Sequence, residues 1–71
     1  MIEMRAVYSS HVDEIGYDSE KSEFHVKYQT GDTHVYEGVP PDKAAIVETA
    51  PSIGKALHAE IRGKYKSRLL S

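Results

Sequence analysis

Basic side chains gather toward the end of the sequence, where they could bind phosphate or another acidic group. Four of the seven residues from position 62 to position 68 are cationic: Arg62, Lys64, Lys66 and Arg68. Lysine and arginine at such density are the side chains that neutralise nucleic-acid phosphates. A basic helix end also complements the helix dipole, however, and terminal lysines can serve solubility alone. Lys55 and Lys43 would extend this patch if the helices present the same side.

A second set of candidate residues combines rings and charge in the middle of the sequence: His25, Lys27, His34 and Tyr36. Nucleobases stack on aromatic side chains of this kind. Whether the four residues share a face depends on the register of one hairpin. If residues 30–31 form a two-residue loop, Val26 pairs with Val35, and all four candidates face the solvent side.

A three-residue bulged loop that contains Gly31 gives the opposite result. Val26 then pairs with Tyr36, and His34 opposes Tyr28 on the core side. Tyr36 becomes structural, which suits a chain with only five tyrosines and one phenylalanine to fill its core. The sequence leaves both registers open.

The four histidines, His11, His25, His34 and His58, do not form a ligand set in the sequence. Metal sites often draw two histidines from a compact spacing such as HxxxH, and no such spacing occurs. We therefore expect surface or partly packed histidines, and we predict no metal and no cofactor. The glycine patterns GxxxxGK and GxGxxG, which hold nucleotide phosphates, are also missing.

A catalytic site is not expected. It would need a nucleophile, a base and an orienting group within a pocket, and Ser9, Ser10 and His11 are the only neighbours of these types. Adjacent strand residues point to opposite faces, so Ser10 and His11 are badly placed to share a proton. We expect the serines to serve turns or caps, and the protein to work by binding and not as an enzyme.

The net charge of −2 hides a division between the two halves of the chain. Residues 1–40 hold eight acidic and three basic side chains, whereas residues 41–71 hold three acidic and six basic ones. The negative net charge excludes a uniformly basic nucleic-acid binder, and the uneven distribution of charge indicates that one side of the protein faces a partner. As an alternative, a protein partner would dock on an open sheet edge or on the acidic half, which contains Glu20, Glu23, Asp32 and Glu37.

The bulk composition is that of a small globular domain. Hydrophobic residues make up 39% of the chain and charged residues 28%, close to the averages for folded domains. The chain contains no cysteine, so packing alone must stabilise it, and a reducing cytoplasm is the expected location. No apolar run approaches the roughly 20 residues that cross a bilayer, and no signal-peptide core is present. We expect a monomeric cytoplasmic domain without a membrane partner.

Period-2 alternation predicts three strands in the first half of the chain. The first covers residues 11–18, where Ile15 and Tyr17 alternate with polar or small residues. In the second, Phe24, Val26 and Tyr28 alternate with charged residues and histidine. The composition of residues 29–32 predicts a hairpin connection to a third strand at residues 33–36.

Two helices should follow the strands. Proline suits a helix start because it lacks a backbone N–H, and the N–H groups of the first turn have no partner within the helix. The first helix should therefore run from about residue 41 to about residue 50. The hydroxyl of Ser52 can cap a second helix. Its predicted buried stripe recurs every four residues: Ile53, Leu57, Ile61 and Tyr65. Gly63 either ends this helix or is tolerated within it.

These elements predict an α+β fold in a single domain over residues 1–71. A three-stranded antiparallel β-meander is followed by two helices packed on one face, in the order β-β-β-α-α. The core extends from about residue 7 to about residue 65, and residues 66–71 form a flexible tail. Arg62 has an alternative structural role, in which it hydrogen-bonds the turn around Asp18 and fixes the second helix on the sheet.

Five short segments between Val7 and Tyr65 follow one another in a characteristic order: Val7-Tyr8-Ser9-Ser10, Ile15-Gly16-Tyr17-Asp18, Tyr36-Glu37-Gly38-Val39-Pro40, Ala50-Pro51-Ser52-Ile53-Gly54 and Ile61-Arg62-Gly63-Lys64-Tyr65. Through them the chain resembles the KTSC domain family, named for a segment at the C-terminus of some lysyl-tRNA synthetases. The family typically shows a Tyr-x-Tyr pair in its third strand. This chain departs from that pattern, because His34 replaces the first tyrosine.

The resemblance implies the fold more than a function, because the family has no established activity. Its attachment to a tRNA-handling enzyme suggests RNA as the partner, either tRNA or a single strand. Our leading hypothesis is therefore a nucleic-acid-binding domain that uses Arg62, Lys64, Lys66, Arg68 and Lys55, together with Tyr36, His34, Lys27 and His25. A protein-interaction module is the alternative.

Overall fold

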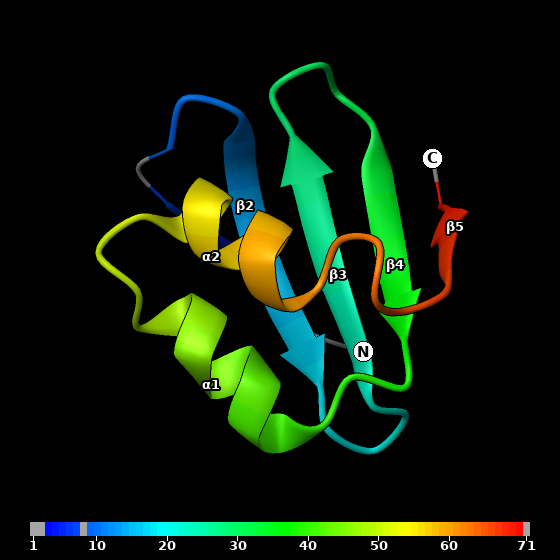
Figure 1. Ribbon diagram of the computed structural model, residues 1–71. Coiled ribbons are helices and arrows are strands. Elements are labelled where there is room, and N and C mark those ends of the chain that lie inside the picture. The colour runs from blue at the N-terminus through cyan, green and yellow to red at the C-terminus, as the bar shows by residue number, and fades with distance from the viewer. Residues whose placement is uncertain (1–2, 8, 71) are drawn as a thin grey trace.

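The computed structural model describes residues 3–7 and 9–70; Tyr8 of the first family segment and Ser71 of the expected tail lie outside this range. One antiparallel sheet has the strand order β1-β2-β3-β4-β5. Its strands are β1 (Arg5–Ala6), β2 (Val12–Asp18), β3 (Glu23–Tyr28), β4 (Thr33–Glu37) and β5 (Ser67–Leu69). Helices α1 (Pro41–Glu48) and α2 (Ile53–Glu60) lie on one side of this sheet (Figure 1). The α+β class is confirmed, but the prediction of a three-stranded sheet is wrong.

The two unpredicted strands, β1 and β5, form the edges of the sheet. β5 occupies part of the segment expected to be a flexible tail, and it places Leu69 opposite His34 of β4. Just before the start of β5, the Glu37 N–H donates a hydrogen bond of 2.7 Å to the Lys66 carbonyl. β1 pairs in the same antiparallel sense with β2. Both strands form hydrogen bonds with backbone groups of β2 and β4 that would otherwise lack a partner. These two strands therefore form because of tertiary pairing and not because of their local sequence.

Residues 29–32 separate β3 from β4, and a hydrogen bond between Tyr28 and Asp32 closes a loop of three residues, 29–31. The Tyr28 N–H donates to the Asp32 carbonyl at 2.8 Å, and the Gly31 N–H donates to the Tyr28 carbonyl at 2.9 Å. Gly31 has a φ of +97°, which glycine adopts without steric cost. The loop is therefore of the bulged kind, one of the two alternatives that the sequence left open.

The register of this hairpin differs from both alternatives that the sequence suggested. Phe24 lies opposite Tyr36, and Val26 lies opposite His34 instead of opposite Val35 or Tyr36. The difference from the bulged alternative is two residues, and a shift of two residues leaves the faces unchanged. Tyr36 accordingly lies on the core side of the sheet.

The helices begin as the sequence predicts and end earlier. α1 starts with Pro41 and stops at Glu48 instead of near residue 50. The Ser52 Oγ accepts a hydrogen bond of 3.4 Å from the Lys55 N–H, which confirms the predicted cap of α2. α2 stops before Gly63, whose φ of +79° places it in the following turn.

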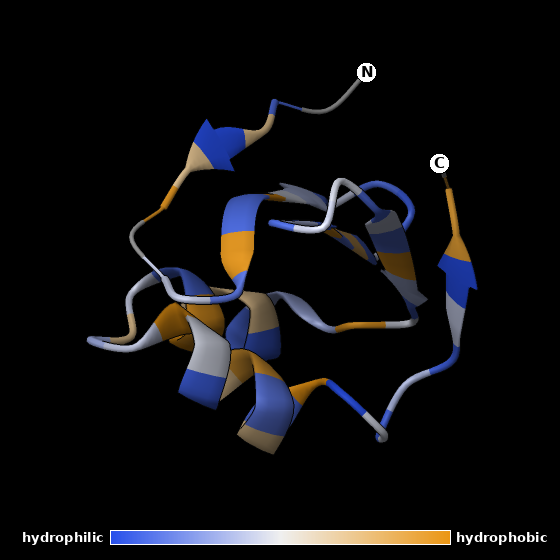
Figure 2. Ribbon diagram, turned by 90° about the horizontal axis from the view of Figure 1, so that it is seen from above, coloured by the Kyte–Doolittle hydropathy of each residue, from blue (hydrophilic) through white to orange (hydrophobic). Residues whose placement is uncertain are grey.

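The core fills the space between the sheet and the two helices, which lie together on one side of it when viewed from above (Figure 2). Its buried residues are Val12, Ile15, Phe24, Val26, Tyr36, Val39, Ala44, Val47, Ile53, Leu57 and Ile61. The predicted helix stripe is confirmed for Ile53, Leu57 and Ile61, which are at most 7% exposed, whereas its fourth member, Tyr65, lies beyond the end of α2 and is only partly buried. Burying one such side chain contributes about 1.5–3 kcal/mol. This packing fixes which side of α2 faces outward.

Candidate anion-binding groove

A hollow of about 600 Å³ lies at the end of the sheet where the β3–β4 hairpin turns. Its lining residues are Ser10, His11, Tyr28, Gln29, Thr30, His34 and Arg62. Tyr28 and His34 come from the two strands, His11 precedes β2, and Arg62 follows α2. A phenol ring, two imidazoles and a guanidinium therefore meet in one hollow.

A second hollow of about 510 Å³ adjoins the first, between α2 and the segment before β2. Its lining residues are Ser9, Ser10, His11, Ser52, Gly54, Lys55, His58 and Arg62. The two hollows share Ser10, His11 and Arg62. Because they share these lining residues, the two hollows lie next to each other, and together they are called here the hairpin-end groove.

The hairpin-end groove is a cationic surface. Arg62 and Lys55 carry positive charges, and His11, His34 and His58 add imidazoles. The described residues that line the groove include no aspartate or glutamate. Within residues 3–7 and 9–70, neither Arg62 nor Lys55 forms a side-chain hydrogen bond or an ion pair. Both cations are available to an anion.

One side of α2 supplies the cations of the groove. Lys55, His58 and Arg62 follow each other at spacings of three and four residues, which places them on one side of the helix and its extension. Leu57 and Ile61, at 1% and 0% exposure, pack into the core on another side. Burial of the apolar stripe therefore directs the basic side chains into the groove.

The opposite wall of the second hollow is held in place by hydrogen bonds. The Ser9 Oγ accepts from the N–H groups of His11 and Val12 at 3.3 and 3.4 Å. Gln29 donates to the same segment, from Nε2 to the Ser9 carbonyl at 2.8 Å and from its N–H to the His11 carbonyl at 2.9 Å. A Cβ on Gly54 would lie only 3.1 Å from the Ser9 Oγ, so α2 approaches this wall closely. The groove is preformed.

Tyr36 supports the groove from within the core. It is 5% exposed, and its hydroxyl lies 2.7 Å from the hydroxyl of Tyr28. Burial, and then this hydrogen bond, raise the pKa of Tyr28, so its hydroxyl stays protonated at neutral pH. The half-buried Tyr28 ring meets the His34 ring edge-on, with 5.4 Å between centroids and 83° between planes. Tyr36 is structural, and Tyr28 and His34 are the rings at the groove.

The predicted stacking platform of His25, Lys27, His34 and Tyr36 is divided between the two faces of the sheet. His34 and Tyr36 face the helices, whereas His25 and Lys27 lie on the other, outer face. The Lys27 Nζ is 3.8 Å from a carboxylate oxygen of Glu14. The His25 Nε2 is buried 3.8 Å from Glu23 and has no hydrogen-bond partner among the described residues.

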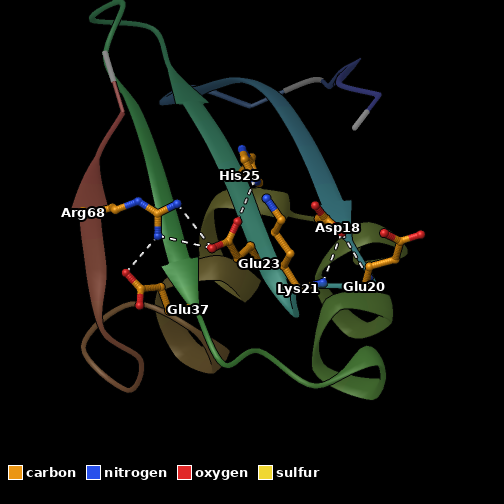
Figure 3. Close-up of polar contacts among 7 residues, drawn as sticks. All are labelled: Asp18, Glu20, Lys21, Glu23, His25, Glu37 and Arg68. Atoms are coloured by element: carbon orange, nitrogen blue, oxygen red, sulfur yellow. Dashed lines mark hydrogen bonds and ion pairs between the residues drawn. The ribbon is translucent and has the colours of Figure 1, made fainter. Parts of the chain in front are cut away.

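Arg68 also lies on the outer face. Its Nη1 donates to Glu37 at 2.9 Å, and both Nη atoms lie 3.2 Å from an oxygen of Glu23. Figure 3 shows the guanidinium reaching from β5 to carboxylates of β4 and β3. These hydrogen bonds, that of Glu37 first, raise the pKa of Arg68. Arg68 therefore ties the edge strand to the sheet and does not contribute to the groove.

The predicted basic patch is consequently dispersed. Lys64 and Lys66 are exposed on the connection between α2 and β5 and line neither hollow. The Lys43 Nζ lies 2.9 Å from Glu60, a contact that raises the pKa of Lys43 and lowers that of Glu60. Of the residues predicted from sequence, the groove brings together Arg62, Lys55 and His34.

The alternative role of Arg62 at the turn after β2 is wrong. Within that turn the Asp18 carboxylate accepts hydrogen bonds from the N–H groups of Glu20 and Lys21 at 3.0 and 3.2 Å (Figure 3). The turn lies at the other end of β2 from the groove. A hollow of about 530 Å³ beside it is acidic, with Glu3, Asp18, Glu20 and Glu48 among its lining residues. The two ends of the sheet thus differ in charge.

Sequence reasoning missed His11, His58 and Tyr28 as residues of the site. The position of His58 between Lys55 and Arg62 on one helical stripe could have revealed it. His11 and Tyr28 join the groove only through tertiary packing. Across the described chain, no group of three or more histidine or acidic side chains is arranged to hold a metal ion.

The sequence-family model of the KTSC domain matches residues 8–65 of the chain. The chain belongs to the KTSC domain family. A crystal structure of a KTSC domain protein from Yersinia pestis is similar to this KTSC domain with a TM-score of 0.95 and 27% sequence identity, and the similarity covers 100% of both chains. None of the curated proteins matches.

Several of the segments that carry the KTSC resemblance meet at the groove. Ser9, Ser10, Ser52, Gly54 and Arg62 belong to three of these segments, and all five line the groove. The segments are separated in sequence and are brought together by the packing of α2 beside the start of β2. Neither described helix of this KTSC domain has the length and apolar character needed to cross a bilayer.

Proposed function

We propose that this KTSC domain is a non-enzymatic binding domain for single-stranded nucleic acid, RNA foremost, and that the hairpin-end groove is its binding surface. One observation supports the proposal: Arg62 shares one hollow with the rings of Tyr28 and His34 and shares the adjoining hollow with Lys55. Neither cation pairs with another described residue, and no described carboxylate lines either hollow. Guanidinium and ammonium groups bind phosphates, and nucleobases stack on aromatic rings.

The two hollows suit different parts of a nucleotide. The hollow beside α2 contains Lys55, His58 and Arg62 and suits phosphate. The hollow beside the hairpin contains Tyr28 and His34 and suits a base. Leu69 lies directly opposite His34 in β5 and is 62% exposed, so it extends the apolar surface next to that hollow. The bases of a single strand can reach such a surface, whereas the bases of a duplex are stacked inside the double helix.

Titration of a labelled single-stranded RNA, followed by fluorescence anisotropy, tests the proposal. Binding should be present at about 50 mM salt and clearly weaker at about 200 mM salt, because phosphate contacts release counterions. Lys55→Gln should weaken the binding. Lys21→Gln is the matched control, since Lys21 lies in the turn at the other end of β2. Absence of binding at low salt, or indifference to salt, would overturn the proposal.

Docking to a protein is the second candidate, and the edge of the sheet supports it. Leu69 of the edge strand β5 is 62% exposed, and Leu70, which follows this strand, is 54% exposed. The acidic surface supports it less, because Glu23 and Glu37 are engaged by Arg68. A pull-down from lysate, with and without nuclease, separates the candidates: material lost on digestion supports nucleic acid, and a nuclease-resistant protein partner supports docking.

A further inference from the structure

The distribution of unpaired cations limits how long the bound part of a nucleic acid is. Lys27, Lys43 and Arg68 stand within 4 Å of carboxylates, and the guanidinium of Arg5 donates to the Glu48 carbonyl at 2.7 Å. The groove itself has Arg62 and Lys55, and no other lysine or arginine of the described chain lines it. A surface that follows a long strand needs a continuing cationic track. Lys21, Lys64 and Lys66 pair with no carboxylate among the described residues, but they line neither hollow, so the groove itself is one concentrated positive site and not such a track.

The donors of the second hollow suit an anion with several free oxygens. Arg62 presents a planar fork of N–H donors, and Lys55 presents an ammonium. The hydroxyl of Ser10 and the imidazoles of His11 and His58 line the same hollow. An internal phosphodiester has two non-bridging oxygens and one negative charge, whereas a phosphomonoester has three terminal oxygens and a charge of about −1.5 to −2 at neutral pH. A phosphomonoester can therefore accept hydrogen bonds from more of these donors than an internal phosphodiester can.

We infer that the groove recognises the terminal phosphomonoester of a nucleotide or oligonucleotide, with the phosphate held beside α2 and the adjoining base placed against Tyr28 and His34. The inference rests on the proposed nucleic-acid function and narrows it to a chain end. Arg62 and His11 line both hollows, so they stand where the phosphate part and the base part of such a ligand join. Two sources supply this chemistry, the end of an RNA strand and a free mononucleotide.

Anisotropy titrations of short single-stranded RNAs of one sequence test this inference. One RNA has hydroxyl groups at both ends, a second has a 5′-phosphate, and a third has a 3′-phosphate. At least one phosphorylated RNA should bind about tenfold more tightly than the hydroxyl-ended RNA, as expected for added charge-assisted hydrogen bonds. Lys55→Gln should abolish most of this preference, and Lys21→Gln should retain it.

The outcomes separate this inference from the proposed function. Equal binding of all three RNAs overturns the inference and leaves nucleic-acid binding intact, whereas absence of binding by all three overturns both. Competition by a nucleoside monophosphate identifies the source. If it displaces the phosphorylated RNA at a similar concentration, the ligand is a free nucleotide; if it displaces the RNA only at far higher concentration, the ligand is an RNA end. Both results support recognition of the terminal phosphate.

Discussion

Replacing Arg62 by glutamine should weaken binding of an end-phosphorylated RNA without destabilising the domain. The Arg62 side chain is exposed and makes no hydrogen bond or ion pair with another described residue, so little folding energy depends on it. Hydrogen bonds from a charged donor contribute about 1.5–3 kcal/mol. Their loss corresponds to a rise in Kd of about tenfold to about a hundredfold. Loss of one phosphate contact should also reduce the slope of log K against log salt by about 0.7.

Arg68→Gln is the matched control, because it makes the same substitution on the outer face. Arg68 is engaged with Glu23 and Glu37, so its replacement should lower Tm while leaving Kd and the salt slope near the wild-type values. Anisotropy titrations at several salt concentrations give Kd and the slope, and circular dichroism gives Tm. Wild-type affinity of Arg62→Gln would refute the reasoning. A larger loss of affinity in Arg68→Gln would refute it too, because the outer face would then hold the phosphate.

Three further predictions concern the stability of the fold. Tyr36→Phe removes the hydroxyl that lies 2.7 Å from that of Tyr28, and should lower stability by about 1 kcal/mol and Tm by about 4–8 °C; an unchanged Tm would argue against a structural hydroxyl. Leu57→Ala, at a side chain 1% exposed, should reduce the free energy of unfolding in urea by about 2–5 kcal/mol, and a wild-type urea midpoint would contradict its burial in the core. Lys43 lowers the pKa of Glu60 below 4.5, so the stability from this pair is present above that pH and is lost as pH falls through the lowered pKa. Glu60→Gln should therefore lose less Tm than the wild type between about pH 5 and about pH 3, and an equal loss would show that the pair contributes nothing.

The strongly periodic parts of the fold could be predicted from sequence. Alternation at Phe24 and Val26 marked β3, and the stripe of Leu57 and Ile61 marked the buried side of α2, because burial imposes these periods directly. The strands β1 and β5 could not be predicted, since two or three residues carry no period and pair only because an edge is free. The register of the β3–β4 hairpin could not be predicted from sequence either, for a related reason. It depends on which residues close the loop around Gly31, not on composition.

The groove was predictable only where its residues share one element. Lys55 and Arg62 were identified as cations of the second helix, and they do reach the same surface. Arg68 has the same charge and lies close to Arg62 in sequence, yet its side chain lies on the outer face. The reason is that β5 pairs with β4 so that Arg68 lies opposite Val35, which is on that face. His11 was set aside because no ligand spacing links it to another histidine. Tertiary packing brings it to Arg62.

Amide chemical-shift mapping tests most directly which face of the domain is used. The nitrogen-labelled domain would be titrated with a short RNA that carries a terminal phosphate. The largest shifts should occur at groove residues, above all Ser10, His11, Lys55 and Arg62. Shifts centred on Lys27, Val35 and Arg68 of the outer face, with the groove unchanged, would contradict the account.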